Sequence, residues 1–375
     1  MNTKTLIKII EDLSDPEKSE RVKVTVQDYL RNTELSLVDR AIVDATLLQR
    51  DGKTKDAIEK WRSIANIAEG IDDRLAARAW VSVGNLLLEE KKNEEALSVY
   101  DKAISLKSDD AVIYNAQGAT KFLLGQLESA IFDYDEAIRL KPDYAMAYTN
   151  RGTAKGELGQ HESAIADYDE AIRLKPDDAM AYTNRGIVKG ELGQYESAIA
   201  DYDEAIRLKP DDAMAYTNRG IVKGELGQHE SAIADYESAI MKYNEQIGLK
   251  PGDAVAYNGR GLAKIQLGEP ESAISDFDEA IRLKPDDTIP YTNRGWAKNE
   301  LGQHESALID CNKAIRLKPD NAFAYKNRAI AKTSIGDVQE AKADYQMALK
   351  LAKQTRNTSL KTEIEQSLQK LNSTD

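Results

Sequence analysis

A motif that recurs every 34 residues constrains the fold of this chain more than any other feature. Residues 145–178 read AMAYTNRGTAKGELGQHESAIADYDEAIRLKPDD, and residues 179–212 repeat this text with three differences. Self-similarity at such a period is typical of solenoids, in which each unit buries its apolar face against its neighbours. We therefore predict nine successive units, at 38–76, 77–110, 111–144, 145–178, 179–212, 213–253, 254–287, 288–321 and 322–353.

Each unit carries the signals of two helices joined by a tight turn. In the copy at 179–212 we expect the first helix over about 179–192 and the second over about 196–209. Asp178 can accept hydrogen bonds from the free N–H groups that start the first helix, and Gly193 can adopt the left-handed conformation that ends it. Pro210 prevents the second helix from continuing. The alternation predicts an all-α fold.

The spacing of large and small residues resembles that of the tetratricopeptide-repeat family, W-x₂-L-G-x₂-Y followed by A-x₃-F and P. The copy at 77–110 carries this pattern most fully, through Trp80, Val83, Gly84, Leu87, Ala96, Tyr100 and Ala103. The resemblance covers roughly residues 38–353. It implies a right-handed superhelical solenoid of antiparallel helix pairs, with the first helix of each pair on the concave side.

Charged residues replace the family's Leu and Tyr on the first helices. Most copies have an Arg and, four residues later, a Lys, as Arg185 and Lys189 do, and their second helices carry an Asp such as Asp201. Arginine is well suited to a two-pronged contact with a carboxylate. We therefore predict Arg–Asp pairs between the two helices of each unit, which would set the register of the repeats.

The ends and one insertion depart from the repeat. Residues 1–37 match no copy and are interpreted as an N-terminal helical cap, with a docking element as the alternative. Residues 354–375 are expected to form a C-terminal capping helix through Leu360, Ile364, Leu368 and Leu371. The copy at 213–253 is seven residues too long, so its second helix should lengthen by about 10 Å. Residues 241–247 are then either a tolerated insertion or a docking ridge.

One stripe of the first helix repeats along the chain and should line the concave side. Its members are the candidates for peptide binding: Met146, Met180, Met214, Thr149, Thr183, Thr217, Asn150, Asn184, Asn218, Asn293, Asn327, Ile187, Ile221 and Trp296. A carboxamide can pair with both the N–H and the C=O of an extended peptide. The asparagine column resembles the ladder in the repeat domain of the O-linked N-acetylglucosamine transferases, which holds peptide main chain. Gly259 interrupts the column.

Two alternatives for this stripe stay open at the level of sequence. The asparagines could bridge neighbouring helices, which is a purely structural role. The methionines could pack between adjacent first helices, although their flexible side chains also suit contact with varied partners.

Composition and motifs argue against several classes of function. A formal net charge of −13 and a pI near 5.0 disfavour binding to nucleic acid or to anionic membranes. No apolar run is long enough to span a bilayer, and the single cysteine fits a reducing, cytoplasmic location. We interpret Cys311 as buried packing, and His161, His229 and His304 as solvated turn residues. No cofactor motif or catalytic constellation is present, so we do not expect an enzyme.

The function predicted from sequence is a non-enzymatic scaffold or adaptor that binds an extended segment of another protein in the concave groove. The alternative is a regulatory or sensor subunit of a larger enzyme or defence complex, docked through the N-terminal cap and the insertion at 241–247. A third interpretation is a module that targets an enzyme carried on a separate chain.

Overall fold

A computed structural model describes residues 37–107 and 109–373, and every regular element in these ranges is an α-helix. Residues 1–36, which hold almost all of the predicted N-terminal cap, lie outside the described residues. The chain divides into two compact units, with the boundary between Arg151 and Gly152. Each unit is described separately below.

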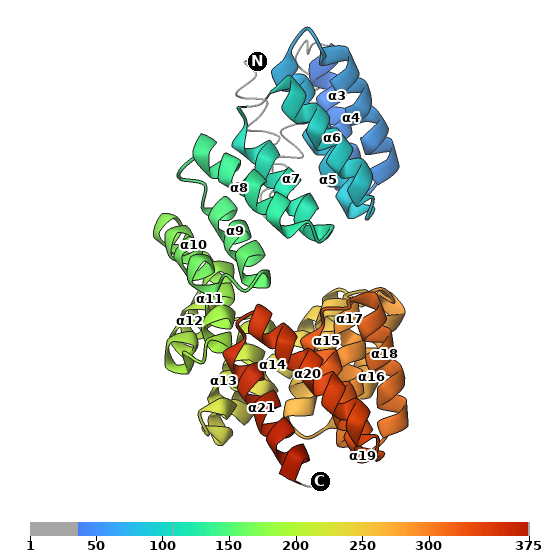
Figure 1. Cartoon of the computed structure of the whole chain (residues 1–375). Coiled ribbons are helices and arrows are strands. Elements are labelled where there is room, and N and C mark those ends of the chain that lie inside the picture. Colours follow the sequence, from blue (N-terminus) through green and yellow to red (C-terminus); the bar gives the residue numbers. More distant parts are fainter. Residues whose placement is uncertain (1–36, 108, 374–375) are drawn as a thin grey trace. The chain divides into compact units, whose positions relative to one another are not determined.

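The N-terminal unit contains three helix pairs and the start of a further helix (Figure 1). Its helices are α3 (Leu37–Arg50), α4 (Thr54–Ala68), α5 (Asp73–Glu89), α6 (Asn93–Leu106), α7 (Ala111–Leu123), α8 (Leu127–Leu140) and the first half of α9 (Ala145–Glu157). Trp61, Trp80, Tyr100 and Tyr134 are large side chains of its core and are at most 6% exposed.

The C-terminal unit continues the same alternation from the second half of α9. Its helices are α10 (His161–Leu174), α11 (Ala179–Glu191), α12 (Tyr195–Leu208), α13 (Ala213–Glu225), α14 (His229–Leu249), α15 (Ala254–Gln266), α16 (Pro270–Leu283), α17 (Thr288–Glu300), α18 (His304–Leu317), α19 (Ala322–Ser334), α20 (Val338–Gln354) and α21 (Thr358–Ser373). Odd-numbered helices up to α19 are the first helices of their pairs, and even-numbered helices are the second helices. First helices that follow one another also touch, as α13 touches α15, which places them on the inner side of the solenoid.

Small residues allow the two helices of a pair to approach closely. The ring of Tyr202 on α12 packs against Gly186 on α11, where an added Cβ would lie 2.8 Å from a ring carbon. Gly193 ends the α11 turn with a φ of +75°, a conformation that favours glycine. Asp178 accepts a hydrogen bond from the backbone N–H of Met180, as expected for a residue that caps a helix.

The predicted Arg–Asp pairs are confirmed in the C-terminal unit. The guanidinium of Arg185 donates two hydrogen bonds to Asp201, at 2.9 and 2.6 Å, and a third to Asp169 of the preceding repeat at 2.5 Å. Lys189 lies 2.7 Å from the same Asp201 carboxylate. Equivalent bidentate pairs are Arg219–Asp235, Arg260–Asp276, Arg294–Asp310 and Arg328–Asp344. One arginine therefore ties together both helices of its own repeat and the second helix of the preceding repeat.

The insertion lengthens α14 to 21 residues, whereas α12 has 14. The two additional turns bring Tyr243 over Gly259 on α15, where a Cβ would lie 2.3 Å from the phenol. Tyr243 is only 6% exposed and forms a side-chain hydrogen bond with Thr217. Gly259 interrupts the asparagine column because this ring occupies the space that an asparagine side chain would need.

The C-terminal unit ends with α21 packed on α20. Leu360, Ile364 and Leu371 are at most 8% exposed and join the apolar cluster that includes Tyr345. The start of α21 also contacts α11 (Figure 1), a contact that the repeat pattern did not predict.

Candidate protein-interaction face

Exposed apolar side chains recur at the second residue of the first helices. In the C-terminal unit these are Met180, Met214, Val255, Ile289 and Phe323, which are 44–64% exposed. In the N-terminal unit, Val112 and Met146 occupy the same position and are 48% and 53% exposed. We call the five residues of the C-terminal unit the apolar column. The methionines therefore do not pack away between adjacent first helices.

Sequence reasoning selected only the methionines of this set. It missed Val112, Val255, Ile289 and Phe323, although all four lie at the same register position and all are apolar. The signal was present in the alignment of the repeats. Comparing positions by apolar character, and not by residue identity, would have found it.

The predicted threonines do not lie on an accessible surface, and this part of the prediction is wrong. Thr149, Thr183 and Thr217 are 1–2% exposed, and each hydroxyl donates a hydrogen bond to the backbone carbonyl four residues earlier, at 3.0 to 3.3 Å. The reason is the close packing of consecutive first helices, such as α11 on α13, which covers these side chains. These side chains form their contacts within the solenoid.

Four of the five asparagines donate a hydrogen bond to the preceding first helix. Asn184 Nδ2 lies 3.3 Å from Thr153 Oγ1, and Asn327 Nδ2 lies 3.1 Å from the backbone oxygen of Thr292. Asn150 and Asn293 make the corresponding bonds to Asn115 and Asn258. These contacts are the structural bridging that the sequence left open, and they leave the amides only partly available to a peptide.

Asn218 differs from the others. Among the described residues it has no hydrogen-bond partner, and its side chain is half-buried. The position that accepts a bond from Asn184 is Thr153, but the same position one repeat later is Ile187, which has no polar side-chain atom. The donor and acceptor groups of Asn218 thus form no hydrogen bond with the described residues.

Three larger apolar candidates lie on the same helices and are half-buried. Ile187 and Ile221 pack partly against the clusters around Tyr202 and Tyr236. The indole Nε1 of Trp296 donates a hydrogen bond of 3.2 Å to Glu300 at an exposed site. These side chains contribute to the core and also leave part of their surface accessible.

Acidic residues follow the stripe at the C-terminal ends of the first helices. Glu157, Glu225 and Glu300 are exposed, and Glu191 is half-buried. Burial, and then the negative charge of Glu157, raise the pKa of Glu191 to about 7. The face therefore combines apolar side chains with carboxylates.

Potential reactive groups are held in structural roles. Cys311 is fully buried, and burial raises its pKa to about 12, so the thiolate is strongly disfavoured. Within the described residues, no cluster of His, Cys, Asp and Glu is arranged to hold a metal ion. None of the described helices combines the length and the apolar character needed to cross a membrane.

One histidine contradicts the prediction of solvated turn residues. His229 is exposed, but His161 is 1% exposed, because the turn between α20 and α21 covers it. His304 is half-buried beside Asn299.

Comparison with known proteins agrees with this architecture. Family models described as TPR repeat match residues 118–159, 156–193 and 189–227, and models described as tetratricopeptide repeat match 77–110, 254–287 and 290–321. No curated protein sequence matches the chain.

One solved structure shares the fold at low sequence identity, and a second shows a weaker similarity. A chain of the APC/C hetero-tetramer Cut9–Hcn1 aligns with a TM-score of 0.54 and 17% identity, over 86% of this chain and 62% of that one. A tetratricopeptide-repeat protein from Parabacteroides merdae aligns with a TM-score of 0.49 and 19% identity, over 68% of this chain and 98% of that one. The matched repeats cover more than half of the sequence, and the chain belongs to the tetratricopeptide-repeat family.

Proposed function

We propose that this chain binds an extended segment of a partner protein along the inner face of its C-terminal unit. Tetratricopeptide repeats serve in general as scaffolds for protein interaction, typically without catalysis. The proposal adds a site and a mode of binding, in which the partner contacts the apolar column, Asn218, and the exposed parts of Ile187, Ile221 and Trp296. We infer that the role is non-enzymatic.

The observation that carries the proposal is the apolar column. Five successive first helices each expose a large apolar side chain at the same position. Scattered apolar residues are normal on a protein surface, but a repeated set on one face marks an interaction site. Methionine side chains can adapt to different partners, so the face favours apolar contact over a main-chain ladder of amides.

The carboxylates near the column define the charge of the partner. Glu225 and Glu300 are exposed on the same first helices, and the net charge of the whole chain is −13. Such a field attracts basic segments and repels acidic ones. The partner segment should therefore carry apolar residues flanked by Lys or Arg.

The test uses peptides selected against the purified chain from a random display library. Replacing Met214 and Ile289 by serine removes two apolar contacts of the column. Each side chain is about half exposed, so burial of its exposed part by a bound peptide is worth about 1 kcal/mol. The pair of changes should weaken selected peptides roughly 30-fold, measured by calorimetry or fluorescence anisotropy.

The same two repeats supply a matched control. Ile233 and Ile309 lie on the second helices and are 46% and 70% exposed, so Ile233→Ser with Ile309→Ser removes similar apolar surface elsewhere. This control should leave peptide affinity unchanged. Equal weakening by both pairs, or by neither, would contradict a site on the inner face.

A second candidate function rests on the long helix α14. Its additional turns leave Met241 56% exposed and Leu249 90% exposed, which is consistent with a ridge that docks on another subunit. Loss of a native complex on Met241→Ser with Leu249→Ser, with peptide binding retained, would favour this alternative. Retention of the complex would count against it.

A further inference from the structure

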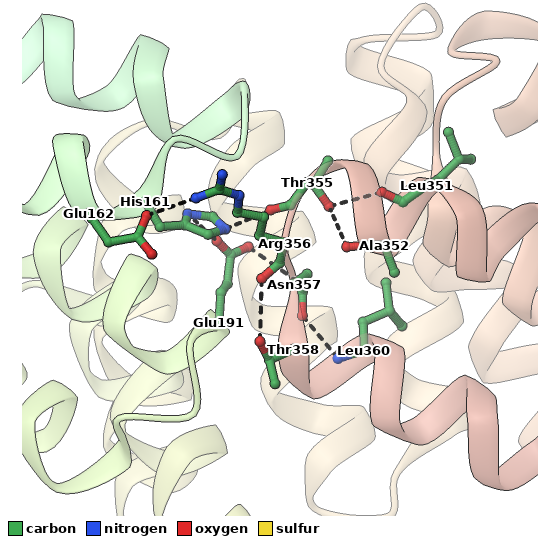
Figure 2. A network of polar contacts seen from close by, with 10 residues as sticks. All are labelled: His161, Glu162, Glu191, Leu351, Ala352, Thr355, Arg356, Asn357, Thr358 and Leu360. Carbon is green, nitrogen blue, oxygen red and sulfur yellow. Dashed lines mark hydrogen bonds and ion pairs between the residues drawn. The ribbon is translucent and has the colours of Figure 1, made fainter.

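The two ends of the C-terminal unit meet at a contact between distant turns. The turn between α20 and α21, residues 355–357, lies against the turn between α9 and α10 (Figure 2). Gly159 is buried there, and an added Cβ would lie 2.7 Å from the Cα and carbonyl carbon of Thr355. Backbone atoms cannot move aside as a flexible side chain can. Glycine is therefore required by the contact itself as well as by its φ of +70°.

His161 shows that the contact is specific. Its Nε2 lies 2.6 Å from the backbone oxygen of Thr355. A carbonyl only accepts hydrogen bonds, so Nε2 carries the proton and donates it. The equivalent residue two repeats later, His229, is exposed, although the surrounding sequences are almost identical. The environment of His161 is therefore created by the distant turn and not by its own repeat.

Further polar contacts surround this hydrogen bond (Figure 2). Arg356 lies 3.2 Å from Glu162, and Asn357 Nδ2 lies 3.5 Å from Glu191 Oε1. Asn357 also accepts a hydrogen bond from the backbone N–H of Leu360, which caps α21 and fixes the direction in which the helix leaves the turn. The turn itself adopts an uncommon conformation, because Arg356 has a φ of 52°.

Two weaker contacts extend the junction. Tyr195 Oη lies 3.4 Å from Ser359 Oγ, and Lys318 Nζ lies 3.9 Å from Glu157 Oε2. All of these contacts are polar, and the side chains of Arg356 and Glu162 are 64% and 71% exposed. Exposed ion pairs hold surfaces together only weakly. Such a junction can open without disturbing the apolar packing between repeats.

We propose that the turn at residues 355–357 is a polar latch that closes the C-terminal unit on itself and can be released. In the closed form, Thr355, Arg356 and Asn357 bind His161, Glu162 and Glu191. In the open form these contacts are absent, and each repeat keeps its own packing. Glu191 lies at the end of the α11 stripe that carries Met180 and Asn184, so the latch touches one end of the inner face. The latch is independent of whether that face binds a peptide.

The near-identical repeats provide a matched test. Gly159→Ala introduces a Cβ into the backbone of Thr355. Gly193→Ala and Gly227→Ala impose the same strain at φ values of +75° and +73°, but nothing lies within 4 Å of either position. Any difference between Gly159→Ala and these controls therefore measures the contact with the latch.

The readout is the distance between spin labels on Ser163 and Lys353, both exposed beside the junction, in a chain carrying Cys311→Ala. The labelled chain with all three glycines unchanged should give a narrow distribution of short distances between the labels. Gly159→Ala should lose the short distances, whereas Gly193→Ala and Gly227→Ala should keep them. Short distances retained in Gly159→Ala, or absent before any substitution, would overturn the latch.

Two controls address loss of folding and contact between copies of the chain. If Gly159→Ala fails to fold, as judged by helical circular dichroism, Arg356→Glu offers a second route. It places like charges at an exposed pair with Glu162, so it should open the latch without unfolding the repeats, and unchanged short distances would refute the proposal. A mixture of the two singly labelled chains should give no short distances. A signal in that mixture would show contact between copies and would also refute an intramolecular latch.

Discussion

The carboxylate of Asp201 offers the sharpest test of how the repeats are held in register. It is 6% exposed, accepts hydrogen bonds from Arg185 and forms an ion pair with Lys189, and the side chains of these two partners are 16% and 13% exposed. Burial alone would lower the pKa of Arg185, but its hydrogen bonds to Asp201 and Asp169 and their charges raise it overall. The arginine is therefore held as a cation by its partners.

Asp201→Ala removes the carboxylate that pairs with both Arg185 and Lys189. Loss of one partner from a buried pair costs about 3–5 kcal/mol. Arg185 keeps Asp169, and both cations retain some contact with water, so we expect about 3 kcal/mol, at the lower end. Asp201→Asn keeps the shape and one acceptor oxygen, and it should cost roughly half as much.

Asp203→Ala is the control because it changes the same residue type on the same helix. Asp203 is 56% exposed and pairs with Arg219 of the next repeat at 2.6 Å. An exposed pair of this kind is worth about 0–1 kcal/mol. The assay is urea denaturation followed by circular dichroism, combined with hydrogen exchange of α11 and α12, because solenoids can unfold in parts. A difference below about 0.5 kcal/mol between the two variants would refute the assignment of a buried cost to Asp201.

Three further predictions follow from burial and charge. Cys311 should resist a thiol reagent in the folded chain and react after denaturation, and fast labelling of the native chain would contradict its burial. Tyr243→Ala should destabilise the chain by about 3–5 kcal/mol, and Gly259→Ala should be harmful in the native chain but tolerated beside Tyr243→Ala, as measured by thermal unfolding. The pKa of Glu191 is raised from 4.5 to about 7, which stabilises the folded, latched form. This contribution is fully present below pH 4.5 and is lost as pH rises through about 7. Burial lowers the pKa of His161, so its contribution is present above 6.5 and is lost as pH falls through the lowered value. The labelled chain should therefore open as pH rises through about 7, and Glu191→Gln should abolish that change.

Much of the fold was predictable because it depends on residues close together in sequence. The i,i+4 spacing of Arg185 and Lys189 places both on one side of α11, and Asp201 follows 16 residues after the arginine in every such pair. Helical geometry then decides that these groups meet. The lengthening of α14 followed in the same way from a count of residues.

The candidate site was less predictable because small differences between copies decide where a side chain points. The amide of Asn184 donates a hydrogen bond to Thr153, but the equivalent position for Asn218 holds Ile187, and no pattern of asparagines alone distinguishes the two. The burial of Thr183 depends on the distance between adjacent first helices, which is set by packing across repeats. A periodic stripe therefore identifies a helix face but not which of its members remain accessible.

The contact at His161 is harder still, since it joins residues 194 positions apart. Its geometry accumulates from the small rotation that each intervening repeat adds, and an error of a few degrees per repeat would separate the turns completely. The sequences around His161 and His229 are nearly the same, yet one side chain is buried and the other exposed. What distinguishes one repeat from another in this chain is therefore its position along the solenoid. Substitutions made at one position in successive repeats separate the effect of that position from the effect of the residue.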